Sequence, residues 1–227
     1  MPSPFENSIF FNIVCKKANN QSTPTAILGG MSGSSFAPET LLSNLPIVVF
    51  DFETTGIDAR KERIIEVGAV RFENRKEVGR FSQLINPGVK LSQEITDITG
   101  INDDMLTNAP SAAQVIPALH DFMRGAVGVA HNAEFDANFL SYESSRLGIQ
   151  CNYHILCTLK LSRALLKLQR YKLDFLAQHY GLTFESRHRS IGDILVTAEV
   201  LWRMLDENPN LKSLADIAPY KQEMVQI

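Results

Sequence analysis

Apolar residues occur along the chain in two patterns, short continuous runs and stripes spaced three or four residues apart. The runs predict five strands, near residues 47–52, 64–72, 78–85, 126–130 and 152–156. The stripes predict helices, near residues 92–97, 102–107, 111–123, 133–147, 158–168, 173–180 and 190–206. Three strands followed by alternating helices and strands predict an α/β sheet with one antiparallel strand.

Proline and glycine interrupt this pattern at defined places. Pro117 removes an amide donor from the helix near 111–123, so we expect that helix to start late or to kink. Glu73-Asn-Arg75 predicts a hairpin-like turn between the second and third strands.

The two ends of the chain differ from its middle. Residues 1–45 contain many Ser, Asn, Thr, Gly and Pro, and we expect a flexible N-terminal extension there. A single domain is expected at 46–206, followed by a C-terminal tail at 207–227. The apolar run 9–14 leaves a second possibility, in which it adds an edge strand to the domain.

Composition fits a soluble intracellular protein. The chain has 227 residues, of which 44% are hydrophobic, enough for one substantial core. Its 3 cysteines form no CxxC pair and leave an odd one, which favours a reducing compartment. The early run 9–14 is too short to span a membrane and lacks the basic leader of a signal peptide. We therefore expect a cytoplasmic protein without membrane contact.

Two carboxylates end the first predicted strand. Asp51 and Glu53 follow the apolar run 47–50, and the strand breaks into a turn at Gly56. Alternate side chains of a strand share one face, so both carboxylates point the same way. Such a pair repels unless a cation lies between the two groups, and two buried charges without partners are rare. Oxygen ligands of this kind suit Mg²⁺ or Mn²⁺.

A further carboxylate follows the short apolar strand near 126–130. Asn132 is expected to be the N-cap of the next helix, which places Asp136 near the first turn of that helix. By itself, Asp136 is equally compatible with an ordinary helix start, where acidic groups favour the helix dipole.

The third set of polar residues precedes the last long helix. Ser190 is predicted to be an N-cap, with Asp193 three residues later in capping-box geometry. Taken alone, Asp193 fits a capping role and His188 fits a solvated surface position. The combination of these residues with the other carboxylates favours a metal site.

Charge is unevenly distributed although the net charge is only −3. Residues 158–190 contain seven Lys or Arg against two acidic residues. A basic rim of this kind could hold a phosphate backbone beside an acidic pocket. An ordinary solvated helical surface explains the same run equally well.

Three segments of the chain resemble the motifs of the DEDDh 3′→5′ exonucleases: Asp51-Phe-Glu-Thr-Thr-Gly56, His131-Asn-Ala-Glu-Phe-Asp136 and His188-Arg-Ser-Ile-Gly-Asp193. This family includes the proofreading epsilon subunit of bacterial DNA polymerase III and the exonuclease domain of the Gram-positive replicative polymerase. The resemblance runs from about residue 46 to 205 and includes Ile98-Thr-Gly-Ile101 and Tyr171-Lys-Leu-Asp-Phe-Leu176. Cys157 departs from the pattern, because many relatives have Asp there, but that position is not one of the four metal carboxylates.

The resemblance implies a ribonuclease H-like fold, a five-stranded mixed sheet in order 3-2-1-4-5 flanked by helices, and two bound Mg²⁺ or Mn²⁺ ions. In this family pattern Asp51 would bridge both ions. Glu53 and Asp193 would complete the first site, and Asp136 would hold the second.

The resemblance also implies roles around the metals. His188 would accept the proton of the attacking water, a task that suits the pKa of imidazole. Thr54, Gly56 and Ile57 would line the terminal nucleotide.

The function implied is removal of nucleoside monophosphates from single-stranded or mispaired 3′ ends of DNA, in proofreading or repair, with a DNA polymerase subunit as a possible partner. Two alternatives stay open from the sequence. One is an RNA exonuclease, since a metal site that binds phosphate does not distinguish the sugar. The other is an inactive nucleic-acid-binding or polymerase-tethering module.

Overall fold

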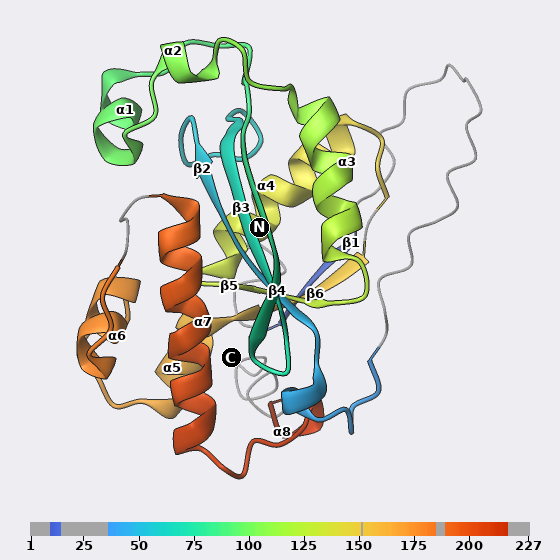
Figure 1. The fold of residues 1–227 in the computed structure, drawn as a ribbon, viewed down its shortest axis with the longest axis vertical. Helices are drawn as coiled ribbons and strands as arrows, with labels where there is room; N and C mark the ends of the chain where they lie inside the picture. The colour runs from blue at the N-terminus through green and yellow to red at the C-terminus, as the bar shows by residue number, and fades with distance from the viewer. Residues whose placement is uncertain (1–9, 15–35, 151, 185–188, 218–227) are drawn as a thin grey trace, which may run out of the picture.

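A central sheet organises the domain (Figure 1). The computed structural model describes residues 10–14, 36–150, 152–184 and 189–217. Within them a six-stranded sheet has the order β1-β6-β5-β2-β3-β4. Its strands are β1 (Phe10–Val14), β2 (Ile47–Thr54), β3 (Ile64–Glu73), β4 (Lys76–Leu84), β5 (Val127–Ala130) and β6 (Asn152–Cys157).

Strand pairing confirms the predicted sheet. The strand β3 is antiparallel to both β2 and β4, whereas β5 pairs in parallel with β2 and with β6. The five expected strands therefore occur in the expected order, and β3 is the antiparallel one.

The structure adds a sixth strand, which corrects the expectation that 1–45 lies outside the domain. Residues Phe10–Val14 form β1 and pair antiparallel with β6, from Phe10 opposite Leu156 to Val14 opposite Asn152. The run is rich in aromatic and β-branched residues, which favour strands, and β6 offers it an otherwise open edge. Residues 1–9 and 15–35 of the expected extension lie outside the described part of the chain.

The helices lie in two layers and an arm. They are α1 (Gln93–Thr99), α2 (Asp103–Leu106), α3 (Ala112–Met123), α4 (Ala133–Arg146), α5 (Thr158–Leu165), α6 (Leu173–Tyr180), α7 (Ser190–Glu207) and α8 (Leu214–Ile217). One apolar cluster joins a sheet face to α3 and α4, and a second joins the other face to α5, α6 and α7. A small third cluster holds the arm with α1 and α2. No helix in these described ranges is long and apolar enough to cross a membrane.

The helix α3 contains Pro117 and nevertheless starts at Ala112, so of the two expectations, a late start or a kink, the late start is wrong. The side chain of Gln114 accepts a hydrogen bond of 3.0 Å from the Ser111 amide, which fixes the first turn. Ile116 is buried beside the proline. Because this face packs on the sheet, burial outweighs the one hydrogen bond that proline removes.

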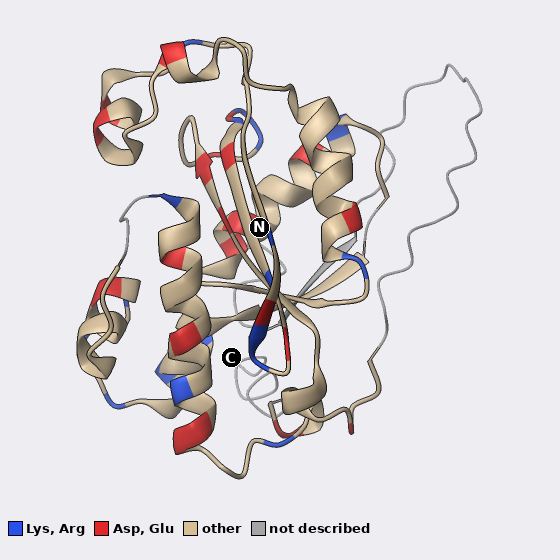
Figure 2. Ribbon diagram, viewed as in Figure 1, with Lys and Arg blue, Asp and Glu red and all other residues tan. Residues whose placement is uncertain are grey.

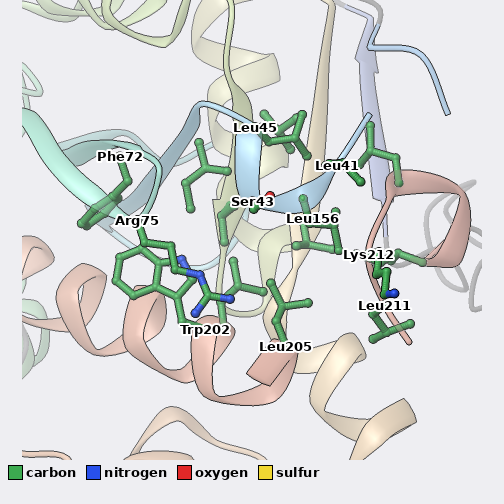
Figure 3. A pocket seen from close by; sticks show the side chains of 17 residues that line it. Leu41, Ser43, Leu45, Phe72, Arg75, Leu156, Trp202, Leu205, Leu211 and Lys212 are labelled. Carbon is green, nitrogen blue, oxygen red and sulfur yellow. The ribbon is translucent and has the colours of Figure 1, made fainter. Parts of the chain in front are cut away.

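At the start of β2 the two ends of the domain meet. The Leu42 amide donates to the Lys212 carbonyl at 2.8 Å, and the Ala215 amide donates to the Pro38 carbonyl at 2.7 Å. These two segments, with α7, line a cavity of about 300 Å³ whose side chains are mostly apolar (Figure 3). Residues 36–45 and 207–217 therefore pack as parts of the domain, although the sequence suggested an extension and a tail.

Candidate metal centre

The central strand β2 carries the first two candidate ligands. Its odd-numbered residues Ile47 and Val49 belong to the apolar cluster with α7. Asp51 and Glu53 continue this row, so their carboxylates face the start of α7. Figure 2 shows acidic positions on β2 and β3 gathered between α4 and α7.

Two helices supply the other candidate ligands. Carboxylate oxygens of Asp51, Glu53 and Asp193 all lie within 4.8 Å of one another. Asp136, in the first turn of α4, is 2% exposed and accepts a hydrogen bond of 3.1 Å from the Phe52 amide. The structure thus brings together the four carboxylates that the sequence singled out.

Electrostatics make this cluster unfavourable for ionised groups. Burial, then the charge of Asp136, and then Glu53 and Asp193 hold the pKa of Asp51 well above its usual range. Burial, followed by Glu66 and Asp193, raises the pKa of Glu53 to about 8, and Arg189 opposes this shift. Burial also raises the pKa of Asp136.

These residues fit a divalent cation. Three oxygens within 4.8 Å of one another can share one ion. A positive ion at this point would relieve the repulsion that raises the carboxylate pKa values. Hard carboxylate oxygens are the ligands that Mg²⁺ and Mn²⁺ prefer.

A fifth carboxylate, Glu66 on β3, was missed by the sequence analysis. It is 2% exposed and lies opposite Glu53 in the strand register. Arg189 donates to it through Nε at 3.1 Å and through Nη2 at 2.8 Å. The signal in the sequence was a single charge inside the apolar run 64–70, which predicts a buried and paired group.

The helix starts beside the cluster differ from the predicted caps. Asn132 precedes α4 as expected, but its backbone is left-handed, with φ of 63°, and its side chain makes no capping bond. Ser190 is the first residue of α7 and not its N-cap, because Arg189 occupies that position. The Ser190 hydroxyl is buried and has no hydrogen-bond partner among the described residues. The predicted capping box with Asp193 is therefore wrong.

The turn after β2 holds the residues expected to line a nucleotide. Thr54 is buried, and its hydroxyl donates to the Gly56 carbonyl at 2.7 Å. A Cβ on Gly56 would come within 2.9 Å of the Glu62 side chain, which would have to shift to make room for it. Ile57 at the tip is 90% exposed and is available to a ligand.

Arg146 of α4 fastens the base of this turn. Its Nη2 donates to the carbonyls of Ala59 at 2.9 Å and Arg60 at 2.8 Å. Its Nη1 donates to the buried Glu143 carboxylate at 2.9 Å. The turn is thus held against α4 while its tip remains exposed.

The two histidines of the motifs, His131 and His188, differ in whether the structure describes them. His188, the expected proton acceptor, lies outside the described residues. Burial lowers the pKa of His131 to about 4, and its Nδ1 lies 3.0 Å from the Thr158 hydroxyl. His131 is therefore a neutral structural residue. Cys157, where many relatives have Asp, is buried, and burial raises the pKa of its thiol.

The basic stretch 158–190 is not uniformly a free cationic surface. Arg189 pairs with Glu66, and the guanidinium of Arg170 lies 5.0 Å from the ring centre of Phe175. Arg187 falls outside the described residues.

A mixed sheet in this order, with half-buried carboxylates on its central strand, places the chain in the ribonuclease H-like class of folds. Residues 48–201 match the exonuclease family RNase_T, and the chain belongs to that family.

Two relatives named DNA polymerase III PolC-type are similar in sequence. The protein of Caldanaerobacter subterraneus subsp. tengcongensis is 40% identical over 173 residues, which cover 75% of this chain and 12% of the relative. The protein of Thermotoga petrophila is 35% identical over 195 residues, which cover 81% of this chain and 14% of the relative. The chain therefore spans only a small part of the length of the curated relatives it matches.

Two solved structures are similar in fold. Exonuclease X in complex with 5′ overhanging duplex DNA is 26% identical, with a TM-score of 0.60 over 75% of this chain and 98% of that chain. The zinc-bound complex of E. coli ExoI with single-stranded DNA has a TM-score of 0.67 over 74% of this chain and 42% of that chain. At 16% identity, the second similarity concerns the fold alone.

Proposed function

We propose that this chain is a metal-dependent 3′→5′ exonuclease that removes nucleoside 5′-monophosphates from single-stranded or mispaired 3′ ends of DNA. The observation that carries the proposal is the half-buried cluster of Asp51, Glu53 and Asp193, with oxygens within 4.8 Å of one another, next to the buried carboxylate of Asp136, which the Phe52 amide fixes. Membership of the exonuclease family supports hydrolysis as the reaction. The polymerase relatives and the DNA complex of Exonuclease X support DNA as the substrate.

Two Mg²⁺ or Mn²⁺ ions, when bound, would supply an activated water and stabilise the charge that develops on the phosphate. Asp51, Glu53 and Asp193 would hold one ion. Asp51 and Asp136 would hold the other. The Phe52 amide keeps Asp136 beside the strand that carries the other ligands.

His188 would act as the general base. It would accept a proton from the water whose oxygen forms the new bond to phosphorus, while the bond from phosphorus to the 3′-oxygen of the preceding nucleotide breaks. Solvent would provide the proton for that leaving oxygen. The next residue in the chain, Arg189, is held by its ion pair with Glu66.

The terminal nucleotide would lie against the turn after β2. The exposed Ile57 side chain would contact its base, and the buried Thr54, bonded to the Gly56 carbonyl, would shape the turn that presents Ile57. A mispaired end would react faster than a paired end, because less energy is needed to unstack its terminal base. Lys167 and Arg170 of the basic stretch would bind the backbone farther along the strand.

Cytoplasmic proofreading or repair beside a DNA polymerase is the setting that we propose. The similarity to PolC-type polymerases supports it, since those relatives contain a matching region within a much longer chain.

The test is digestion of four substrates that carry the same sequence: single-stranded DNA, duplex DNA with a mispaired 3′ end, fully paired duplex DNA and RNA. We expect stepwise shortening from the 3′ end with added Mg²⁺, release of 5′-monophosphates and faster cleavage of the first two substrates. Asp51→Asn is the matched inactive control. Preferential cleavage of RNA would favour the RNA exonuclease, and tight binding without cleavage by the wild type would favour an inactive binding module.

The contribution of the basic stretch has its own test. Charge reversal in Lys167→Glu and Arg170→Glu should raise KM for single-stranded DNA and reduce its salt dependence, with kcat nearly unchanged. An unchanged KM and salt slope would assign these residues to an ordinary solvated surface.

A further inference from the structure

Glu66 is the buried carboxylate of the cluster that the proposed mechanism does not use. It pairs with Glu53 across β2 and β3, and directly opposite residues of an antiparallel pair point to the same face. Like charges in such positions destabilise a sheet. The repulsion between Glu66 and Glu53 must therefore be offset, either by a function of Glu66 or by a residue that pairs with it.

The residues that pair with Glu66 lie at the N-terminus of α7. Glu66 Oε1 accepts bonds from Arg189 Nε at 3.1 Å and Nη2 at 2.8 Å, which form a two-pronged pair. Its Oε2 accepts a bond of 3.2 Å from the Ser190 amide. One carboxylate on β3 thus holds two consecutive residues at the N-terminus of the helix.

This contact replaces a cap that the local sequence lacks. Arg189 at the N-cap makes no side-chain capping bond, so a first-turn amide is satisfied from another element. The approach is close: a Cβ on Gly68 would lie 2.3 Å from the Ser190 hydroxyl oxygen and 2.9 Å from Ile194 Cδ1. Glu66 and Gly68 together set where α7 meets the sheet.

Asp193 depends on the same turn. Its amide donates to the Arg189 carbonyl at 3.4 Å, and the Gly192 amide donates to that carbonyl at 2.9 Å. A shift of Arg189 would therefore move the Asp193 carboxylate away from Asp51 and Glu53.

We propose that Glu66 is a positioning residue, which through Arg189 and the Ser190 amide places Asp193 against Asp51 and Glu53 so that the three can hold a divalent cation. This inference rests on the proposed function for its catalytic consequence. Its consequence for metal binding is independent of which substrate the chain cleaves.

The test compares Mn²⁺ binding, measured by calorimetry on metal-stripped full-length protein, in the wild type, Glu66→Gln and Arg189→Lys. Glutamine keeps the size of residue 66 and an oxygen for the Ser190 amide, but it cannot form the charged pair. Lysine keeps the charge of residue 189 but lacks the planar fork. We expect about 10-fold to 100-fold weaker Mn²⁺ binding in Glu66→Gln, the usual effect of a residue that orients a ligand, and a smaller loss in Arg189→Lys.

Kinetics on single-stranded DNA provide the second measurement. At saturating Mn²⁺ the variants should have a lower kcat with KM changed less than about 2-fold, because Glu66 acts on the metal ligands and not on DNA binding.

Glu143→Gln is the matched control, since Glu143 is equally buried and pairs with Arg146 at 2.9 Å on α4. It should bind Mn²⁺ like the wild type. An equal loss of Mn²⁺ affinity in Glu143→Gln would show a general loss of packing and would overturn the inference. Wild-type affinity and kcat in both Glu66→Gln and Arg189→Lys would also overturn it.

Failure of the proposed function would give a different result from failure of the positioning role of Glu66. If the wild type cleaved none of the four nucleic acids but Glu66→Gln still weakened Mn²⁺ binding, the positioning role would stand and the nuclease assignment would fall. If the wild type were active and both Glu66→Gln and Arg189→Lys bound Mn²⁺ like the wild type, the nuclease assignment would stand and the positioning role would fall.

Discussion

The Phe52 amide donates a hydrogen bond of 3.1 Å to the Asp136 carboxylate, and this bond joins residues 84 positions apart in the chain. Phe52 lies between Asp51 and Glu53, so its amide is fixed relative to both. The bond therefore sets the position of the α4 carboxylate by the backbone of β2, and it does so without using the side chain of another ligand.

This bond leads to opposite expectations for two variants of Asp136. Asp136→Asn keeps an oxygen for the Phe52 amide and removes a charge from a crowded site, so the metal-free protein should be as stable as the wild type or more stable. Asp136→Ala leaves a buried amide without a partner and should lose about 1–3 kcal/mol. Both should lose at least about 100-fold in kcat. Urea unfolding and digestion of single-stranded DNA check the pair, and equal stability of the two variants would contradict the role of the bond.

The raised carboxylate pKa values predict how stability changes with pH. The pKa of Glu53 rises from 4.5 to about 8 on folding, so the native metal-free protein holds more protons than the unfolded chain between these values. This contribution to stability is complete below pH 4.5 and is lost as pH rises through 8. Burial lowers the pKa of His120 and His131 from 6.5 to about 4, which opposes the trend only below pH 6.5. The free energy of unfolding should therefore fall between pH 6.5 and 8.

Urea unfolding of metal-stripped protein across that interval measures this fall. Glu53→Gln should show a shallower fall, because the substituted side chain does not ionise. Added Mg²⁺ should stabilise the wild type most at the upper end of the interval, where the carboxylates are ionised. A wild-type stability that rises from pH 6.5 to 8 would contradict the assignment.

His188→Ala tests the general base. We expect kcat to fall by about 10²–10⁴, with Mn²⁺ affinity and KM for DNA nearly unchanged. The acidic limb of the pH profile of kcat should lose the step that belongs to this histidine. Equal kcat of wild type and variant from about pH 6 to 9 would leave His188 as a surface residue.

Gly68→Ala tests how closely α7 must approach the sheet. The added methyl would lie 2.3 Å from the Ser190 hydroxyl oxygen and 2.5 Å from its Cβ, so the start of α7 must move. We expect a loss of about 1–3 kcal/mol and weaker Mn²⁺ binding. Gly79→Ala on β4 is the matched control, because its methyl would meet Phe122 at an ordinary 3.4 Å. Equal effects of the two substitutions would mean that the contact with α7 is not decisive.

The pairing of β1 with β6 predicts that removal of the N-terminal residues lowers the stability of the domain. A protein that begins at Met31 lacks Phe10–Val14 and leaves the edge of β6 open. Its Tm should fall by about 4–8 °C, the equivalent of about 2 kcal/mol, while activity is retained because β2, α4 and α7 carry the site. A protein that begins at Ile9 should match the full chain. An unchanged Tm in the shorter protein would show that β1 does not stabilise the domain and would support the expectation of a flexible extension.

The sequence predicted the sheet well because its signals are local. Several predicted strands are continuous apolar runs, as in Ile47–Phe50, and a short run of this kind is typical of a buried strand. The pairing of Phe10–Val14 with β6 could not be decided in the same way, because a short apolar run fits an edge strand and a loose segment equally.

The sequence was sufficient to predict the carboxylates of the candidate site. It was not sufficient to predict the residues that hold those carboxylates in place. Asp51 and Glu53 alternate on one strand, so their common direction follows from strand geometry. The pairing of Glu66 with Arg189 depends on strand register and on the approach of α7, which residue spacing does not encode. Ser190 shows the same limit, since a favourable capping sequence was overridden by the contact of Glu66 with its amide.

The meeting of residues 38–42 with residues 212–215 at the start of β2 has a consequence for architecture. The segment that leads into β2 and the segment that follows α7 are therefore bonded to each other at the end of β2 opposite to the carboxylates. The two elements that carry Asp51, Glu53 and Asp193 are thus tied together twice, by Glu66 of the neighbouring β3 and Arg189 beside the site and by this backbone junction away from it. A change at the junction would alter the anchorage of both elements and would reach the metal ligands without touching them.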